Sequence, residues 1–230
     1  MRHLAIVAAL LAVPAVAEEM PVVVELFTSQ GCSACPPADA ILAGLAELDG
    51  VIALSLHVDY WDYLGWPDSL AQPAFSARQE AYARAAGERM VYTPQIVMNG
   101  ADRMVGGDAM AVMERLRAHS GVSTPVDLRL TRDGATLRIE AQATGPLPPL
   151  SVHLVRVRPF ESVTIEKGEN AGLTMDYRNV VAAWDVVGRW DGAEPLRLDA
   201  PLPGPEPAVV LLQEDRDGLP GRIVAAARVD

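Results

Sequence analysis

Basic side chains are scarce in this chain, which has 19 Lys and Arg residues against 30 Asp and Glu residues and a formal net charge of −11. Such an excess of negative charge repels phosphate backbones and anionic lipid headgroups, so neither nucleic acid nor a membrane surface is expected as a partner. Internal repeats are lacking, and no apolar run after Met20 approaches the roughly 20 residues that a spanning helix needs. Half of the residues are hydrophobic, which argues against a disordered chain.

The first residues have the layout of a secretory signal. Arg2 and His3 precede an apolar run at 4–13, and Pro14 and the small residues 15–17 follow it. A membrane anchor is the alternative, but the apolar run is too short to span a bilayer comfortably. We therefore expect residues 1–17 to be a signal peptide, with the mature protein periplasmic or secreted and without a membrane span.

The first half of the chain alternates between strand-like and helix-like segments. Pro36 suits the first turn of a helix, Gly87 a left-handed helix end, and Asp108 a helix cap, while Asn99–Gly100 is a two-residue hairpin signal. The expected elements are strands at 22–28 and 51–59, helices at 36–49, 76–87 and 108–119, and a hairpin across 95–107. A helix between the first two strands makes them parallel, so a mixed sheet with helices on its faces is predicted.

In the second half, helical periodicity disappears and short strands alternate with turns. The segment at 121–126 is the expected linker, and the expected strands lie at 126–130, 136–143, 150–158, 208–215 and 222–228. This pattern predicts an all-β sandwich or barrel. We place the domain boundary between residues 18–122 and residues 123–230.

Cysteine is nearly absent, and the two residues present, Cys32 and Cys35, follow the first strand and precede the first helix. The carboxyl edge of a strand in an open α/β sheet is where sites form. Cys32 is expected in the helix cap region, where backbone N–H groups and the helix dipole favour a thiolate. Cys35, one turn later, is expected to be shielded. Together they predict an exposed nucleophile and a resolving thiol.

Three other uses of the cysteines remain open. A structural disulfide between residues so close in sequence closes a tiny loop and gains little chain entropy. Zinc usually needs four ligands, and no histidines are paired at short spacing. Cu(I) suits thiolates and thioethers, and several methionines cluster in sequence, although methionine at strand and helix positions is more often core filler. The methionines are Met90, Met98, Met104, Met110 and Met113.

The C-x-x-C after a strand and Thr93–Pro94 before a strand and hairpin resemble the thioredoxin superfamily over roughly residues 22–119. The resemblance implies an α/β thioredoxin-like fold for the first domain, followed by the sandwich-like one. It also implies that Pro94 is a cis-proline facing the dithiol and that Thr93 faces the substrate. The pair between the cysteines differs from that of thioredoxin, which leaves the direction of the redox chemistry open.

The whole chain is similar to a secreted bacterial thioredoxin-like family labelled domain of unknown function 1223. The similar segments are `ELFTSQGCSACPPAD`, `HVDYWDYLGW`, `YTPQIVMNG` and `KGENAG`. This resemblance supports the fold and the dithiol, but it implies no substrate.

Three further residues are candidates for proton handling beside the dithiol. Many relatives carry a buried acid on the leading strand, and Glu25 is the nearest candidate, although it lies one residue too far from Cys32 and strand alternation can turn it away. If the alternation of side chains along the second strand continues, His57 and Asp59 are expected on the same face, near the dithiol. The alternative is a histidine held by a local hydrogen bond and an aspartate that starts a turn.

The polar loop around residues 166–172 is expected to be a tight turn, with Glu166, Glu169 and Asn170 as ligand or cation contacts as the alternative. The aromatic residues at 60–66 are expected to pack under the following helix, with a hydrophobic rim for unfolded clients as the alternative.

The sequence thus predicts an exported thiol–disulfide oxidoreductase that acts through a mixed disulfide on Cys32, with Cys35 as the resolving thiol. Thr93 and Pro94 would hold the client strand. A disulfide-bearing client protein and a redox partner protein are expected, with no organic cofactor and no resident metal. The rival prediction is a binding protein without redox turnover, such as a Cu(I) carrier that uses the same two cysteines.

Overall fold

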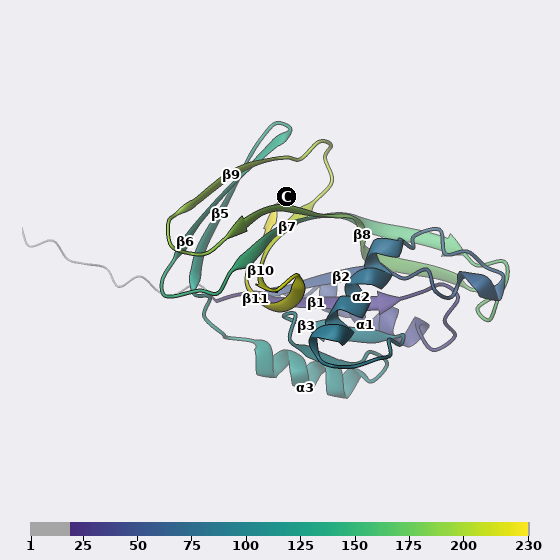
Figure 1. Cartoon of the computed structure of the whole chain (residues 1–230). Helices are drawn as coiled ribbons and strands as arrows, with labels where there is room; N and C mark the ends of the chain where they lie inside the picture. The colour runs from purple at the N-terminus through teal and green to yellow at the C-terminus, as the bar shows by residue number, and fades with distance from the viewer. Residues whose placement is uncertain (1–18, 230) are drawn as a thin grey trace, which may run out of the picture.

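The computed structural model describes residues 19–229, so the predicted signal peptide at 1–17 lies outside the described residues (Figure 1). The helices are α1 (Pro36–Ala46), α2 (Pro73–Ala85) and α3 (Ala109–His119), with the short 3₁₀ helix η1 (Asp62–Leu64). The strands are β1 (Val22–Thr28), β2 (Val51–His57), β3 (Gln95–Met98), β4 (Asp102–Val105), β5 (Val126–Asp133), β6 (Thr136–Ala143), β7 (Leu150–Thr164), β8 (Thr174–Trp190), β9 (Leu196–Pro201), β10 (Ala208–Arg216) and β11 (Leu219–Val229). In this part of the chain, no helix has the length and apolar character needed to cross a membrane.

Local sequence signals place the first-half elements where they were predicted. Pro36 is the first residue of α1, Gly87 has φ +72° just after α2, and the Asp108 side chain accepts hydrogen bonds from two backbone N–H groups at the start of α3. Asn99 and Gly100 both have positive φ in the β3–β4 turn, but Met98 pairs with Asp102, so the loop has three residues, 99–101, and the predicted two-residue turn is wrong by one residue. The helix α2 starts at Pro73, three residues before the expected 76.

The arrangement of strands corrects the predicted fold class. The large sheet has eight strands in the order β11-β10-β7-β8-β2-β1-β3-β4, and it runs through both halves of the chain. β8 pairs in parallel with β2, between Val180 and Ser55, and antiparallel with β7. Of the described residues, 46% lie in strands and 18% in helices. The prediction of a helix-flanked thioredoxin-like α/β fold followed by a sandwich-like domain is therefore wrong.

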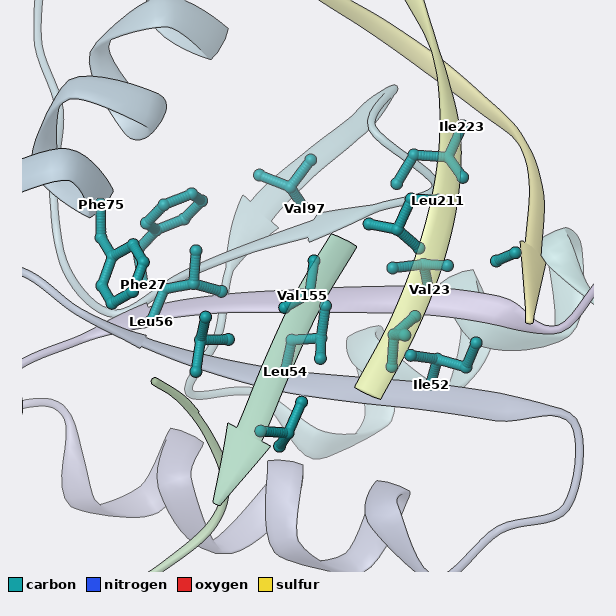
Figure 2. Packing of buried hydrophobic residues seen from close by; sticks show 14 of the residues in the cluster. Val23, Phe27, Ile52, Leu54, Leu56, Phe75, Val97, Val155, Leu211 and Ile223 are labelled. Atoms are coloured by element: carbon teal, nitrogen blue, oxygen red, sulfur yellow. The ribbon is translucent and has the colours of Figure 1, made fainter. Parts of the chain in front are cut away.

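Burial on both faces explains why the second half joins the first. On one face of β7, β10 and β11, side chains pack against the three-stranded sheet β5-β6-β9. The other face of the same strands packs into a cluster with β1, β2 and α2. Figure 2 shows this cluster, in which strands of the second half cross β1 and β2, with Val155, Leu211 and Ile223 near Val23, Ile52 and Leu54. A strand buried on both faces cannot belong to a detached two-layer sandwich.

Successive side chains of β1 point to opposite faces of the sheet, and only one of these faces is the face of the disulfide. Val22, Val24 and Leu26 pack with α1 and α3, whereas Val23 and Phe27 point to the opposite face, which α2 covers. Side chains at the carboxyl ends of β1 and β2 therefore reach the disulfide region only if they point to the same face of the sheet as Leu26.

Substitution of Gly100 tests the junction between the halves. Gly100 has φ +67°, and an added Cβ would lie 2.4 Å from the Gly221 carbonyl oxygen of β11. We expect Gly100→Ala to lower the free energy of unfolding by about 3 kcal/mol or more. The matched control is Gly134→Ala, at φ +58° with nothing within 4 Å of the added Cβ, which should cost only about 1 kcal/mol. Urea denaturation measures both, and equal losses would contradict a close junction.

Candidate functional site

The two cysteines form a buried disulfide at the end of β1. The Cys32–Cys35 bridge joins Cα atoms 5.4 Å apart, and Cys32 is 1% exposed and Cys35 0%. Cys35 is the N-cap residue of α1, while Cys32 lies in the turn before it. Ser33 and Ala34 between them are exposed. The predicted exposure of Cys32 is therefore wrong, and Cys35, instead of Cys32, takes the cap position.

A loop from the second half contacts the turn that carries Cys32, a position that the sequence did not predict. We call residues 165–173, which join β7 to β8, the capping loop. Its Asn170 side chain is buried and donates from Nδ2 to two carbonyl oxygens, those of Gln30 and Cys32, each at 2.9 Å. The loop turns tightly, as predicted, with Gly168 and Gly172 at positive φ. The similarity of `KGENAG` to the family was the available signal, but nothing in the sequence placed this loop beside Cys32.

A second set of contacts holds the turn before Cys32 from the side. The Gln30 N–H donates to Asp68 Oδ2 at 2.8 Å, and the Gln30 side-chain oxygen accepts from Trp66 Nε1 at 2.8 Å. An added Cβ on Gly31 would lie 3.1 Å from Trp61 Cβ, so the Trp61 side chain packs directly on this turn. Two of the aromatic residues predicted to pack therefore do so against the site.

Beneath the disulfide lies a buried polar cluster on the α1 face of the sheet. His57 Nδ1 is 2.7 Å from Asp68 Oδ2, both side chains are fully buried, and the imidazole packs edge-on against the Tyr177 ring of β8. Asp39 of α1 interacts electrostatically with His57 and Asp68. Thr28 is the register partner of His57 and faces the same cluster.

Within the described residues, four buried side-chain atoms have no hydrogen-bond partner, and all four lie on this face. They are Thr28 Oγ1, Asp39 Oδ1, Ser55 Oγ and His57 Nε2. Buried polar groups are normally hydrogen-bonded, so a concentration of exceptions at one place indicates a function or strain.

Burial raises the pKa of Asp39 to about 7, although His57 and the Thr28 hydroxyl oppose the increase. The carboxyl group of Asp39 therefore gains or loses its proton near neutral pH. Burial also raises the pKa of Tyr177, and the nearby carboxyl groups of Asp39 and Asp68 add to this effect. Asp39 was not among the residues predicted for the site, because a single Asp in a helix gives no sign of its burial.

Glu25 and Asp59 lie away from this cluster. Glu25 is fully buried but follows the parity of Val23, and its carboxylate binds Arg78 at 2.6 Å and the Tyr82 hydroxyl at 2.6 Å. The structure thus places Glu25 on the α2 face. Asp59 accepts a hydrogen bond from Ser76 of α2, so it does not join His57. Strand alternation fails there because β2 ends at His57.

Thr93 and Pro94 lie beside the turn that carries Cys32. The Thr93–Pro94 peptide bond is cis, which confirms the predicted conformation. Thr93 Oγ1 accepts from Trp61 Nε1 at 2.8 Å, so Trp61 links Thr93 to the packing surface of Gly31. The backbone N–H and C=O groups of Thr93 form no hydrogen bond with another described residue.

The methionines considered as Cu(I) ligands are dispersed. Met98 is buried in the core with Met104 and Met113 packed around it, whereas Met90 and Met110 are exposed on the surface. Residues 19–229 contain no group of three or more His, Cys, Asp or Glu side chains that is arranged to hold a metal ion.

Comparison with known proteins gives a family and two related structures. The sequence profile of the family described as protein of unknown function (DUF1223) matches residues 23–213. A crystal structure of a protein from Agrobacterium tumefaciens is 35% identical, with a TM-score of 0.79, and the match covers 92% of this chain and 95% of that chain. HBP35 of Porphyromonas gingivalis is 16% identical, with a TM-score of 0.66 and 92% and 75% coverage, which shows a shared fold. No curated protein sequence matches the chain.

The protonation of Asp39 predicts a pH-dependent stability difference. Because the pKa in the folded state, about 7, is above the unfolded value near 3.8, the folded protein binds the additional proton. This contribution is complete below about pH 4 and is lost as pH rises through about 7. Relative to wild type, Asp39→Asn should therefore gain stability between pH 4 and 7, by about 4 kcal/mol at most.

Urea denaturation of both proteins from pH 4 to pH 8 measures this difference. The exposed Asp49 provides the control, since Asp49→Asn should give a difference that does not change with pH. A constant difference for Asp39→Asn would contradict the raised pKa.

Proposed function

Because the chain belongs to the family of proteins of unknown function DUF1223, its activity must be argued from its own site, and we propose that it is an exported thiol–disulfide oxidoreductase. The observation that carries the proposal is that Thr93 and the cis-Pro94 lead into β3, whose Gln95 pairs with Phe27 of β1 just before the Cys32–Cys35 turn, and that Trp61 links Thr93 to that turn. A bridge across so few residues adds little to stability, so stabilisation alone does not account for it. The similarity of these two motifs to the thioredoxin superfamily supports the same chemistry, although the surrounding fold differs.

The reaction is a pair of thiol–disulfide exchanges. A client thiolate attacks the sulfur of Cys32, a bond forms between the client and Cys32, and the Cys32–Cys35 bond breaks with its electron pair on Cys35. A second client thiolate then attacks the mixed disulfide, so the client leaves oxidised and both cysteines are reduced. The reverse sequence reduces a client disulfide. The direction depends on the redox potential of the pair.

Access to Cys32 requires movement of the capping loop. Cys32 is 1% exposed while Asn170 spans the carbonyl groups on both sides of Gly31. The two hydrogen bonds from Asn170 contribute about 1 kcal/mol each. Ile165, at the start of the loop, is also buried, whereas residues 166–169 and 171–173 are exposed, so opening of the segment after Ile165 separates few buried contacts apart from those of Asn170. We propose that client binding displaces this loop.

The client is an extended segment of a disulfide-bearing or dithiol protein. Thr93 is partly exposed and its backbone groups have no partner among the described residues, so they are free to pair with a client strand. A redox partner protein would restore the dithiol or the disulfide. An oxidising compartment is consistent with this chemistry, and we propose that residues 1–17 direct the protein to the periplasm or the exterior.

Equilibration with glutathione tests the proposed function. The protein is incubated in buffers of defined reduced-to-oxidised glutathione ratio, quenched with an alkylating reagent and analysed by mass. We expect reversible reduction of the native protein, and Cys35→Ala should accumulate a mixed disulfide on Cys32 because the resolving thiol is missing. A disulfide that resists every glutathione ratio in the folded protein, with no trapped species, would overturn the proposal in favour of a structural bridge.

Removal of the Asn170 contacts should accelerate reduction. We expect Asn170→Ala to raise the rate of reduction by dithiothreitol about tenfold or more, because the loss of two hydrogen bonds of about 1 kcal/mol each favours the open loop. Glu169→Ala changes an exposed neighbour in the same loop and should leave the rate unchanged. Equal rates for wild type and Asn170→Ala would show that the loop does not control access.

A further inference from the structure

We propose that Asp39 and His57 form a proton relay for the Cys35 thiol, with Asp39 as the proton donor and acceptor and His57, held by Asp68, behind it. The inference rests on the proposed function and extends it to residues that the sequence did not assign together. The relay combines α1, β2 and the loop that carries Asp68.

The helix places Asp39 on the same face as Cys35. Cys35 has helical backbone angles as the N-cap of α1, and the Asp39 N–H donates to the Cys35 carbonyl oxygen at 3.1 Å. Residues four apart on a helix are neighbours on its surface, so the carboxyl group of Asp39 and the sulfur of Cys35 share one face. Asp39 is 5% exposed and Cys35 0%, so a proton leaving or reaching Cys35 cannot pass directly to solvent.

The unpartnered atoms indicate the direction of transfer. Asp39 Oδ1 and His57 Nε2 are both buried without a hydrogen bond of normal geometry to another described residue, and the Thr28 hydroxyl lies near enough to the Asp39 carboxyl group to favour its ionised form. The other nitrogen of His57, Nδ1, faces Asp68 Oδ2 at 2.7 Å, and Asp68 also accepts from the backbone N–H groups of Gln30 and Leu70. Asp68 is the acceptor in these contacts, so Nδ1 is the donor nitrogen of His57 and Nε2 is the nitrogen left without a partner.

The charges around Asp39 come from three elements. His57 of β2 favours the carboxylate, whereas Asp68 disfavours it, and Tyr177 of β8 packs against the imidazole. Burial is the largest influence and favours the uncharged carboxyl group, which is ready to donate. Glu25, the acid predicted for this role, cannot serve, because it lies on the opposite face in an ion pair with Arg78.

The relay completes the exchange reaction without a charge left on Cys35. When the client thiolate attacks Cys32, the electron pair released from the broken S–S bond goes to the sulfur of Cys35, and Asp39 transfers its proton to that sulfur. With the capping loop open, a proton from water reaches His57 Nε2, and His57 passes it to the Asp39 carboxylate and is again neutral. In the reverse direction, the carboxylate takes the proton from Cys35, and the resulting thiolate attacks the mixed disulfide and releases the client thiolate.

Reduction by a water-soluble phosphine across pH tests the relay, since the phosphine is oxidised to its oxide as the disulfide becomes two thiols. Rates are measured between pH 5.5 and 8.5 at phosphine concentrations where they rise linearly, so that opening of the capping loop is not limiting. The ratio of wild-type to Asp39→Asn rates cancels the titration of the phosphine itself. We expect a ratio of about ten or more at pH 5.5, falling to one or below above pH 7 as Asp39 ionises.

Two further variants separate a relay from a structural effect. His57 lowers the pKa of Asp39, so His57→Gln should move the midpoint of the wild-type profile to higher pH. Glu25→Gln removes another buried carboxylate from β1 and should leave the profile unchanged. Near-UV circular dichroism checks that each variant is folded.

The outcomes distinguish the two proposals. If the folded wild-type protein is not reduced at any pH, the proposed function fails and the relay fails with it. If the wild-type protein is reduced, but Asp39→Asn follows the same pH profile and His57→Gln does not shift the midpoint, only the relay is overturned.

Discussion

The carboxamide of Asn170 joins the two halves of the chain at the disulfide. Its single nitrogen donates to the carbonyl oxygens of Gln30 and Cys32, which face it from the turn that β1 delivers. This contact exists only because β8 lies beside β2, since that pairing brings the β7–β8 hairpin over the start of α1. The predicted boundary near residue 122 marks a change in sequence pattern, but it does not separate the site from the second half. Residues from both sides of this boundary surround the disulfide.

The sequence predicted local structure well and long-range pairing poorly. Pro36, Gly87, Asp108 and Asn99–Gly100 act through their own backbone conformation, so their effects are visible without the rest of the chain. β8 was missed because its burial does not alternate regularly, the chain takes a positive φ at Asn179, and the β7–β8 ladder shifts register at Val152/His153 and at Arg156/Val157. The pairing of β8 with β2 depends on surfaces more than one hundred residues apart, and no local pattern encodes it.

The site shows the same division between local and long-range information. C-x-x-C and Thr93–Pro94 were recognisable as motifs, and the cis bond was predicted from position. Asp39 and Asp68 have no motif, and the `KGENAG` segment that contains Asn170 does not indicate its position, since the importance of all three comes from burial and from partners on other elements. Glu25 shows that a shift of one residue along a strand is enough to place a predicted site residue on the wrong face of the sheet. It is one residue out of phase with Leu26, so the strand turns its carboxylate to Arg78, and the polar position on the disulfide side of the β1 end is Thr28.

Burial of the disulfide changes how an exchange reaction here must be controlled. An exposed, acidic thiol at a helix end reacts with any oxidant or reductant that reaches it, so its selectivity depends mainly on redox potential. In the proposed reaction, the buried disulfide is controlled in two ways. The capping loop determines which molecules reach Cys32, and Asp39 and His57 determine the protonation of Cys35. The cover and the proton-handling groups share no side chain, and both contact the Gln30 backbone, whose carbonyl oxygen accepts from Asn170 and whose N–H donates to Asp68. A client that displaces Asn170 would therefore reach the disulfide directly, whereas small thiols depend on spontaneous opening of the capping loop.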